Sequence, residues 1–575
     1  MTDGVLFLVP ARGGSHRIPG KNLRTVAGIP LVGHAIRTAR LAATGLPGGP
    51  HDVVCSTDDP TIATVARGWG AGTPFDRPAT LATADATSVD VALHAVSFFE
   101  AVGRTFRAIA LVQPTSPLTS PLDLRSAVER FDRSGGRPVV SVASVHPAAW
   151  HHAIGVGDVV SAVEAADAGH VLTGAFYVID PLELARARTF TPRGRTVAAI
   201  VAPDRSIDID EPADLVIAEA MAAARPVRSI EVGKPVGGPS VFVIAEAGVN
   251  HQGEPELAHR LIDASADTGA DAVKFQTFDP DALVSADAPT AEYQRAAGEA
   301  DHQHAMLRRL ALPLDAWAGL QAHALDRGIV FLSTPFDDAS ATLLDRLDVP
   351  AFKVGSGELT NLPYLARLAQ KGRPLLVSTG MSDMAEVAAA VDTIAAAGDP
   401  PVALFHCVSN YPAAPEDANL RAIETMRRAF GVPTGWSDHT PGDELALAAT
   451  AIGATLIEKH LTLDRTMTGP DHHASLEPEA FATMVAGIRL VERSLGSGDK
   501  VPRPAEGPIA AVARRSLHWG RSMEAGTQIG PDDLVALRPG DGLSPGRLAD
   551  LVGRRTIRAV VARAAVHLDD IGGPV

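Results

Sequence analysis

The 575-residue sequence contains very little cysteine. Only Cys55 and Cys407 are present, which excludes a disulfide framework and is typical of a protein in a reducing compartment. No stretch reaches the roughly 18 consecutive apolar residues that a membrane-spanning helix needs. The first residues, MTDGVLFLVPARGG, combine an acidic start with a short apolar run, so we expect no signal peptide. Together these features predict a cytoplasmic protein with no membrane partner.

Positive charge is also scarce. The formal net charge is −16, which argues against nucleic acid as a main partner. Among the basic residues lysine is rare, with seven lysines against 44 arginines. Because arginine is the usual cation of this chain, a lysine inside a motif is informative, and Lys21, Lys274 and Lys353 all stand in motifs. A hydrophobic content of 46% and a charged content of 21% are ordinary for a folded chain.

Residues 1–225 alternate apolar runs with helical stretches, as in a domain of strands and helices. This alternation predicts an α/β domain with a largely parallel sheet. The expected strands lie at 6–10, 52–57, 108–113 and 138–144. The next stretch, 226–239, is rich in Pro, Gly and Val without helical periodicity, and we expect it to be a linker.

Eight apolar segments follow within residues 240–500, and each closes in small or polar residues. Eight strand–helix units predict a (β/α)₈ TIM barrel, with a doubly wound sheet as the competing arrangement. The segments are 241–250, 271–277, 330–336, 351–357, 375–380, 402–407, 433–439 and 455–460. After a Pro- and Gly-rich joint, residues 514–575 carry short β-like pieces and turns, which predict a small β-rich C-terminal domain.

A glycine-containing loop follows the first expected strand. In PARGGSHRIPGKN (10–22), two adjacent glycines let backbone N–H groups approach an anion, and Arg12, Arg17 and Lys21 add positive charge. The loop lacks the patterns of a P-loop or a dinucleotide site. A plain strand–helix turn therefore remains an alternative.

Two carboxylates lie near the end of the same predicted domain. In SIDIDEPAD (206–214), Asp208 and Asp210 are two residues apart, so in an extended strand they face the same way. Paired carboxylates suit Mg²⁺ held between protein and phosphates. A solvated acidic strand end is the alternative.

These segments together resemble the CMP-sialic acid synthetases, which join CMP from CTP to a nine-carbon keto acid and release pyrophosphate. The resemblance rests on PARGGSHRIPGKN, STDD (56–59), RPATLATADATS (77–88), LVQPTSPL (111–118) and SIDIDEPAD. It implies a catalytic Lys21, nucleotide contacts from Arg12 and Asn22, Gln113 near the sugar, and Mg²⁺ on Asp208 and Asp210.

The N-terminal region departs from that family at two places. His16 stands where the family has a lysine, and the stretch between residues 144 and 173 is too short for the family's arginine-rich arm. In the family that arm helps to bind the acidic sugar and to form the dimer. The alternative interpretation is an N-terminal domain that only binds nucleotide or serves as a scaffold.

Two histidines end neighbouring strands of the predicted barrel. His439 ends the seventh strand and His460 the eighth, so both imidazoles should lie side by side at one rim. A single histidine there is commonly just a polar end group. Two at matching positions predict a site for Mn²⁺ or a similar divalent metal, completed by water and carboxylate oxygens.

Further polar residues end other strands of the barrel. Glu246, Lys274 and Lys353 end or nearly end the first, second and fourth strands, and two lysines at one rim indicate a substrate with phosphate or carboxylate groups. Four hydroxyl groups on turns at this rim could donate to phosphate oxygens, and a helix cap is the alternative role for each. They belong to Thr334, Ser356, Ser378 and Ser437.

The C-terminal part of the chain, about 240–575, resembles sialic acid synthases and their antifreeze-like (SAF) domain. The motifs are AEAGVNHQG (245–253), DAVKFQT, STPFD, FKVGSGE, STGM, HCVSNYP, SDHT, GPDH, RRSL and LRPGDGLSP. The resemblance implies condensation of phosphoenolpyruvate with an N-acylmannosamine to give a sialic acid and phosphate.

The resemblance also implies roles for these residues. A metal on His439 and His460 would polarise the sugar aldehyde, and Glu246 would orient or deprotonate the water that adds. Lys274, Lys353 and the four hydroxyl groups would hold phosphate and carboxylate. The sugar contacts would be Gln276, Tyr411 and Asp471, with Arg538 of the partner subunit in a homodimer.

The sequence therefore predicts a bifunctional enzyme that makes a sialic-acid-type sugar and activates it with CTP. Legionaminic, pseudaminic and deaminated nonulosonic acids remain alternative products, because the family's synthases for them are nearly identical.

Overall fold

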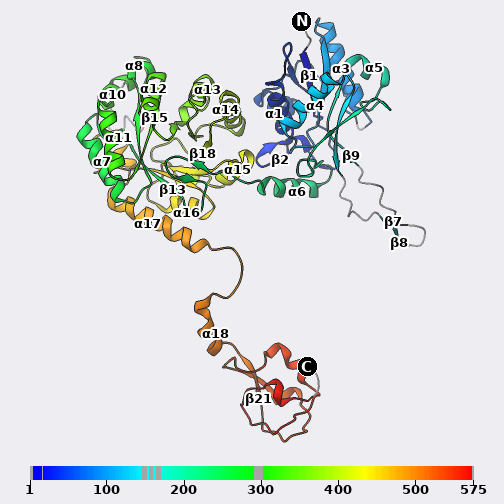
Figure 1. Ribbon diagram of the computed structural model, residues 1–575, viewed down its shortest axis with the longest axis vertical. Coiled ribbons are helices and arrows are strands. Elements are labelled where there is room, and N and C mark those ends of the chain that lie inside the picture. Colours follow the sequence, from blue (N-terminus) through cyan, green and yellow to red (C-terminus); the bar gives the residue numbers. More distant parts are fainter. Residues whose placement is uncertain are drawn as a thin grey trace. The chain divides into compact units, whose positions relative to one another are not determined.

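The structure is a computed structural model that describes residues 4–15, 17–83, 85–144, 152–154, 160–162, 170–290 and 302–572. The chain divides into two compact units, Met1–Ser494 and Leu495–Val575 (Figure 1). The first unit contains an α/β sheet domain and a closed barrel. None of the helices in the described ranges is long and apolar enough to cross a membrane.

The N-terminal domain is built on one six-stranded sheet. Its order is β10 (Val197–Ile200), β6 (Val139–Ser144), β9 (His170–Ile179), β5 (Phe106–Val112), β1 (Gly4–Pro10) and β4 (Asp52–Ser56). Strand β9 runs antiparallel to β5 and β6, whereas the other neighbouring pairs are parallel. The prediction of an α/β domain with a largely parallel sheet is confirmed.

Alternating side chains of β1 serve both faces of this sheet. Val5 and Phe7 belong to an apolar cluster with α1 (Leu31–Ala43) and α4 (Pro121–Arg133). Leu6 and Leu8 belong to another cluster with α3 (Ser88–Ala101) and α5 (Pro181–Ala187). With both faces covered, the open crevice of such a sheet lies at the carboxyl ends of its strands, where the 10–22 loop begins.

The barrel consists of eight parallel strands, and the (β/α)₈ prediction is confirmed. The strands are β13 (Phe242–Gly248), β14 (Ala272–Thr277), β15 (Val330–Pro335), β16 (Phe352–Val354), β17 (Leu375–Ser378), β18 (Val402–Cys407), β19 (Thr434–Asp438) and β20 (Leu456–His460). The helices between them include α7 (Pro255–Asp267), α10 (Gln303–Leu310), α11 (Ala316–Asp326), α12 (Asp338–Arg346), α13 (Leu362–Gln370), α14 (Met384–Ala397), α15 (Arg421–Phe430) and α16 (Glu444–Ala451), and α17 (Pro478–Leu495) follows β20.

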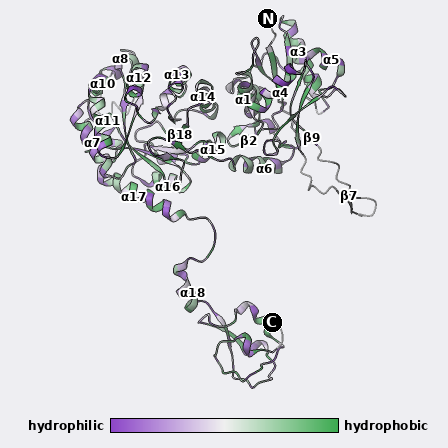
Figure 2. Ribbon diagram, in the orientation of Figure 1, coloured by the Kyte–Doolittle hydropathy of each residue, from purple (hydrophilic) through white to green (hydrophobic). Residues whose placement is uncertain are grey.

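Side chains two apart along a barrel strand lie on the same face, which separates three environments. The inward-facing residues near the strand starts are apolar, for example Phe242 and Ile244 of β13 and Leu456 of β20. The next inward positions are Glu246 and Glu458, both buried. The residues between them, such as Val243 and Ile457, pack beneath the helices. In Figure 2 green, hydrophobic stretches alternate with hydrophilic residues in the barrel.

The segment 226–239, expected to be a linker, is instead partly built into the barrel. It contains β11 (Ile230–Glu231) and β12 (Pro235–Val236), which form an antiparallel hairpin. Ile230, Val232 and Val236 belong to the same buried cluster as the inward-facing residues at the strand starts. The hairpin therefore closes that end of the barrel. The spacing of Ile230 and Val232, two residues apart, was the signal for this packing, rather than the Pro and Gly content.

The C-terminal unit has its own small apolar core. β21 (Ser516–Trp519) pairs antiparallel with β22 (Leu534–Leu537), and isolated bridges such as Met523 with Val560 connect the surrounding loops. Leu517, Trp519 and Val566 lie in its core.

Shortening a buried side chain of the hairpin should weaken the barrel. Because Val232 is 0% exposed, Val232→Ala should lower the free energy of unfolding by roughly 1–3 kcal/mol through lost packing. Urea denaturation measures this change. Its neighbour Glu231 is exposed, so Glu231→Ala should unfold at the wild-type urea concentration; equal behaviour of the two variants would contradict the packing role of the hairpin.

Candidate active sites

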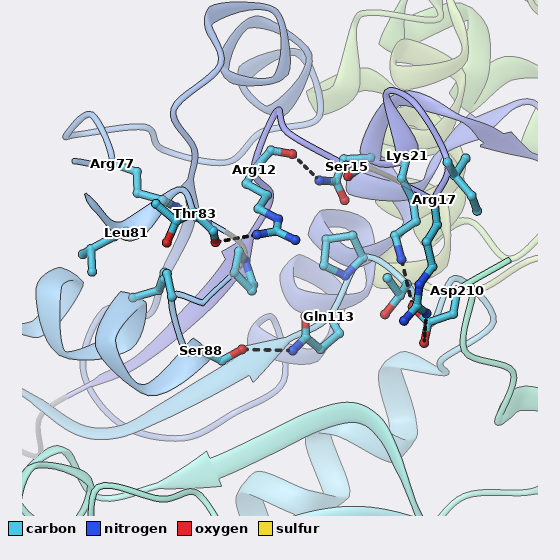
Figure 3. A pocket seen from close by; sticks show the side chains of 17 residues that line it. Arg12, Ser15, Arg17, Lys21, Arg77, Leu81, Thr83, Ser88, Gln113 and Asp210 are labelled. Atoms are coloured by element: carbon cyan, nitrogen blue, oxygen red, sulfur yellow. Dashed lines mark hydrogen bonds and ion pairs between the residues drawn. The ribbon is translucent and has the colours of Figure 1, made fainter. Parts of the chain in front are cut away.

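The N-terminal domain has a cavity of about 470 Å³ at the carboxyl ends of β1 and β5 (Figure 3). Its lining combines cationic side chains with a few polar ones: Arg12, Ser15, Arg17, Lys21, Asn22, Arg77, Ser88, Gln113 and Asp210. A concave, cationic surface next to a glycine-containing loop suits a phosphate-bearing ligand. The structure thus brings most of the residues predicted for the nucleotide site to one cavity.

Lys21 connects the two motifs of this domain. Its Nζ donates to the carbonyl oxygen of Ile209 at 2.7 Å and to Asp210 Oδ1 at 3.2 Å. Arg17 also lies near Asp210, with Nη1 3.8 Å from Oδ2. The loop after β1 and the SIDID segment are 188 residues apart in sequence at this contact, and they meet at the cavity edge.

The two predicted Mg²⁺ ligands have different environments. Both carboxylates are exposed, but Asp210 lines the cavity and Asp208 does not. Desolvation raises the pKa of the Asp208 carboxyl, helped by the charge of Asp210. Residues 206–210 have no regular secondary structure, so the prediction of a strand here is wrong. The buried Ile209 separates them and donates its N–H to the carbonyl oxygen of Thr115 at 2.7 Å.

Other predicted residues of this domain also have protein partners. The Asn22 amide donates to the carbonyl oxygen of Arg12 at 2.9 Å, so it holds the loop. Arg12 itself donates to the carbonyl oxygen of Thr83, and the Gln113 amide lies 3.5 Å from Ser88 Oγ. These contacts leave the Arg12 guanidinium and the Gln113 amide at the cavity wall.

Arg77 is a site residue that the sequence analysis missed. It is 6% exposed, lines the cavity and donates from Nε to Ser56 Oγ at 3.1 Å. Because Arg77 begins the RPATLATADATS motif, its position in a recognised motif was the available signal. His16 lies outside the described residues, as does the shortened arm except for 152–154, 160–162 and 170–173.

The barrel has a cavity of about 510 Å³ at the carboxyl ends of its strands. Its lining includes every residue predicted for the barrel site: Glu246, Lys274, Gln276, Thr334, Lys353, Ser356, Ser378, Tyr411, Ser437, His439, His460 and Asp471. The assignment of roles to these residues stays a prediction, but the structure brings all of them together.

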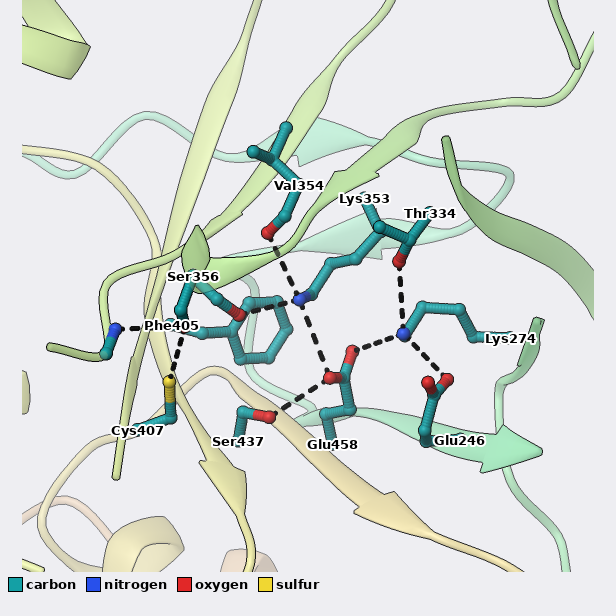
Figure 4. A network of polar contacts seen from close by, with 12 residues as sticks. Glu246, Lys274, Thr334, Lys353, Val354, Ser356, Phe405, Cys407, Ser437 and Glu458 are labelled. Atoms are coloured by element: carbon teal, nitrogen blue, oxygen red, sulfur yellow. Dashed lines mark hydrogen bonds and ion pairs between the residues drawn. The ribbon is translucent and has the colours of Figure 1, made fainter. Parts of the chain in front are cut away.

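Four buried charged groups form the floor of this cavity (Figure 4). Lys274 Nζ lies 2.7 Å from Glu246 Oε2 and 3.8 Å from Glu458 Oε2. Lys353 Nζ lies 3.5 Å from Glu458 Oε1 and donates to Ser378 Oγ at 2.6 Å. Glu458 therefore lies between the two lysines, and the ammonium groups are held in place before any ligand arrives.

The pKa values of these groups are displaced in opposite directions. Burial raises the pKa of Glu246, and the charge of Glu458 adds to this effect. Burial lowers the pKa of Lys353. Although burial opposes it, the pKa of Lys274 is raised because Glu246 and Glu458 surround its ammonium group. Perturbed groups in one cavity are typical of a catalytic site.

Glu458 was missed by the sequence analysis, although the segment TLIEKH was identified. His460 was singled out there, and the residue two positions earlier shares its inward face. Ser437 Oγ donates to Glu458 Oε1 at 3.0 Å, so one predicted hydroxyl group positions this carboxylate. Thr334 accepts from Lys274 Nζ at 3.3 Å, while Ser356 Oγ lies 3.1 Å from Cys407 Sγ.

His439 and His460 have the chemistry of metal ligands. Their ring centroids are 5.6 Å apart, and burial lowers the pKa of His439 to about 4 and that of His460 well below its ordinary value. Both imidazoles are therefore neutral at pH 7. His439 Nδ1 is 2.7 Å from the carbonyl oxygen of Val408, which leaves Nε2 free to accept.

A second observation supports a cation at this place. Nδ1 of His460 is buried without a hydrogen-bond partner among the described residues, 3.8 Å from Asp471 Oδ2. Within the described ranges no three His, Cys, Asp or Glu groups converge as a complete set of ligands. Two imidazoles fit a divalent metal that also takes oxygen ligands from water or substrate.

The same cavity carries the predicted sugar contacts and an apolar wall. Tyr411 packs on His439 with a centroid distance of 4.1 Å, and the Gln276 amide donates to Glu246 Oε1 at 3.1 Å. The apolar lining consists of Phe278, Leu283, Val284, Met306, Leu307, Leu310 and Phe336. Arg538 follows β22 in the separate C-terminal unit, so its contact with a partner's barrel stays a prediction.

Three families match consecutive parts of the chain. Residues 6–169 match Cytidylyltransferase, residues 261–500 match the NeuB family, and residues 514–572 match the SAF domain. Their order agrees with the three predicted regions and with the resemblances stated from the motifs.

Curated proteins match the barrel and C-terminal part over nearly their full length. N,N'-diacetyllegionaminic acid synthase of Legionella pneumophila is 45% identical over 57% of this chain and 94% of its own length. The protein of the same name from Campylobacter jejuni is 40% identical over 54% of this chain and 95% of its own. N-acetylneuraminate-9-phosphate synthase of Mus musculus is 37% identical over 56% and 91%.

Removing either imidazole should weaken metal binding. Since each histidine would supply one of two protein ligands, we expect His439→Asn and His460→Asn each to bind Mn²⁺ at least roughly tenfold more weakly. Electron paramagnetic resonance of free Mn²⁺ measures the affinity. The exposed His473 provides a matched control, because His473→Asn should keep wild-type affinity. Unchanged affinity in the double His439→Asn, His460→Asn variant would rule out this site.

Proposed function

Because the chain belongs to the NeuB family and also contains a cytidylyltransferase domain, we propose that it catalyses two successive reactions in nonulosonic acid biosynthesis. The barrel condenses phosphoenolpyruvate with an N-acylmannosamine to a sialic acid and phosphate. The N-terminal domain then joins this acid to CMP from CTP and releases pyrophosphate. The first product is thus the second substrate, and one chain supplies both activities in equal amounts.

The observation that carries the barrel reaction is the pair of buried lysines around Glu458. Lys274 and Lys353 present two buried ammonium groups, with Glu458 between them. Phosphoenolpyruvate brings a carboxylate and a phosphate, and ammonium groups in a desolvated site attract such an anion. The hydroxyl groups of Thr334, Ser378 and Ser437 would then supply further hydrogen bonds.

In the proposed reaction the methylene carbon of phosphoenolpyruvate attacks the aldehyde carbon of the open-chain sugar. The new carbon–carbon bond leaves a hydroxyl group at the former aldehyde and positive charge at C2 of the pyruvyl unit. Water adds there, and the tetrahedral intermediate loses phosphate. Glu246 orients this water and takes its proton, and burial raises the pKa of this carboxyl, which favours proton uptake.

A divalent metal on His439 and His460 would polarise the aldehyde oxygen as a Lewis acid. The chain's own contribution is to keep both imidazoles neutral and to orient His439 through its bond to Val408. Gln276, Tyr411 and Asp471 would bind the sugar hydroxyl and acyl groups. We also propose a homodimer in which Arg538 of the partner subunit completes the sugar site.

For the N-terminal domain, Arg12, Arg17, Lys21 and Arg77 would balance the triphosphate of CTP. Lys21 has a second effect, because it holds Asp210 beside the cavity where Mg²⁺ would bind with Asp208. Burial and the charge of Asp210 raise the pKa of Asp208, and a cation bound by both carboxylates would favour its ionised form. A domain that only binds nucleotide or serves as a scaffold is the alternative, favoured by the shortened arm.

The apolar wall favours a second candidate for the sugar. α10 presents Gln303, Met306, Leu307 and Leu310 to the cavity, a spacing of three to four residues that places them on one helix face. This surface suits acyl methyl groups and a deoxy carbon better than a free hydroxyl or a phosphate. A 2,4-diacetamido-2,4,6-trideoxymannose, the precursor type of a legionaminic acid, offers such groups.

One reaction mixture tests both activities. Purified protein with N-acetylmannosamine, phosphoenolpyruvate, CTP, Mn²⁺ and Mg²⁺ should yield a CMP-linked nine-carbon sugar by mass spectrometry. Asp208→Ala should stop at the free acid, because only the second step needs its carboxylate. The exposed Asp204 lies just before the SIDIDEPAD segment, and Asp204→Ala should still give the CMP-sugar. Free acid from the wild-type protein would instead support the scaffold alternative.

The choice of sugar can be tested at the wall. If the diacetamido sugar is the substrate, its kcat/KM should exceed that of N-acetylmannosamine by roughly tenfold or more. Leu307→Gln should reduce that preference while the KM for phosphoenolpyruvate stays unchanged. Leu325→Gln, on the exposed face of α11, is the control. A wild-type preference for N-acetylmannosamine would exclude the second candidate.

A further inference from the structure

A buried ion pair lies next to the two histidines in sequence and lines neither of the two cavities described above. Lys459 Nζ is 2.8 Å from Asp438 Oδ2, and both side chains are 0% exposed. Asp438 and Lys459 are register partners on neighbouring strands β19 and β20. Each residue is the chain neighbour of one of the histidines.

The pair faces the opposite side of the barrel wall from the active site. Ser437, His439, Glu458 and His460 line the cavity, so the intervening residues point outward between strands and helices. On that side Trp436 and Ile457 belong to an apolar cluster with α16. A charged pair in such surroundings carries a desolvation penalty, and replacing it with apolar side chains is commonly neutral for stability. Stability alone therefore does not account for it.

The contacts of the pair converge on the loop that carries His439. Lys459 Nζ also donates to the carbonyl oxygen of Thr440 at 2.5 Å. Asp438 Oδ1 accepts from the Thr440 backbone N–H at 2.9 Å and from its hydroxyl group at 2.6 Å. The residues on both sides of His439 are thus tied to the residue that precedes His460. A shift of one strand end would have to break several charge-assisted hydrogen bonds.

We propose that Asp438 and Lys459 are positioning residues that set the separation and orientation of His439 and His460 for one divalent cation. The proposal rests on the metal role of those histidines. Neither residue of the pair touches substrate or metal; they act through the backbone of β19 and β20. The sequence analysis gave no role to Lys459, although it predicted the segment 455–460 as the eighth strand.

The decisive experiment separates positioning from stability. Lys459→Met alone leaves Asp438 buried without its partner and should unfold more easily. The double variant Lys459→Met, Asp438→Leu removes both charges and should regain stability in urea denaturation. We expect this stable double variant to bind Mn²⁺ roughly 10–100-fold more weakly than the wild type, the range found when groups that orient metal ligands are lost.

A second variant keeps the ion pair and removes one of its bonds to the loop. Thr440→Val preserves the shape of the side chain but loses the hydroxyl contact with Asp438, so Mn²⁺ affinity should fall severalfold. The control is Lys234→Met at the closed end of the barrel, where Lys234 pairs with Asp271 at 3.0 Å. This variant should lower stability and leave the Mn²⁺ affinity unchanged.

Electron paramagnetic resonance gives the Mn²⁺ affinity of each variant without any turnover. Wild-type affinity in both the double variant and Thr440→Val would overturn the positioning role while leaving the proposed function intact. A wild-type protein that binds no Mn²⁺ would overturn both, because the histidines would then not be metal ligands. If Lys234→Met weakened Mn²⁺ binding to the same degree, loss of stability would explain the effect, and the proposal would be overturned.

Discussion

The alternation of side chains along the eight barrel strands is the constraint on which the synthase site depends. Closing a parallel sheet into a barrel forces every second residue inward. The same strands must therefore supply apolar inward-facing residues near their starts and charged inward-facing residues near their ends. In β20 this change takes two steps, from Leu456 through Glu458 to His460, while Ile457 and Lys459 serve the outer layer. The register of the barrel strands thus determines which side chains face the cavity.

The charged floor is organised around carboxylates as much as around lysines. Without Glu458, Lys274 and Lys353 would be like charges in a desolvated place, and their pKa values would fall. With it, both ammonium groups are fixed close together in the free protein. Glu458 already holds the two lysines in position in the free protein. The site therefore needs little reorganisation when an anion binds.

The sequence analysis was accurate where a residue's role follows from strand ends. Eight apolar segments predicted the barrel, and polar residues at or near the ends of those segments predicted the convergence of Glu246, Lys274, Lys353, His439 and His460. Glu458 and Lys459 were missed although Lys274 and Lys353 lie equally inside their strands, because only the terminal His460 was considered in the segment 455–460. Arg77 was missed because it lies in a loop, far in sequence from its partner Ser56 at the end of β4. The hairpin at 230–236 was missed because turn-forming residues in its short loop resembled those of a linker.

That hairpin has a consequence for how the two enzymatic regions can be separated. Val232 and Val236 belong to the barrel core, yet in sequence they precede its first strand by several residues. If the chain were divided at the start of β13, the barrel would lose the hairpin that covers the amino-terminal ends of its strands. Two valines of the barrel core would then belong to the N-terminal fragment. The natural place of division lies upstream of Ile230, so the short connection between the two catalytic regions is, for most of its length, a structural component of only one of them.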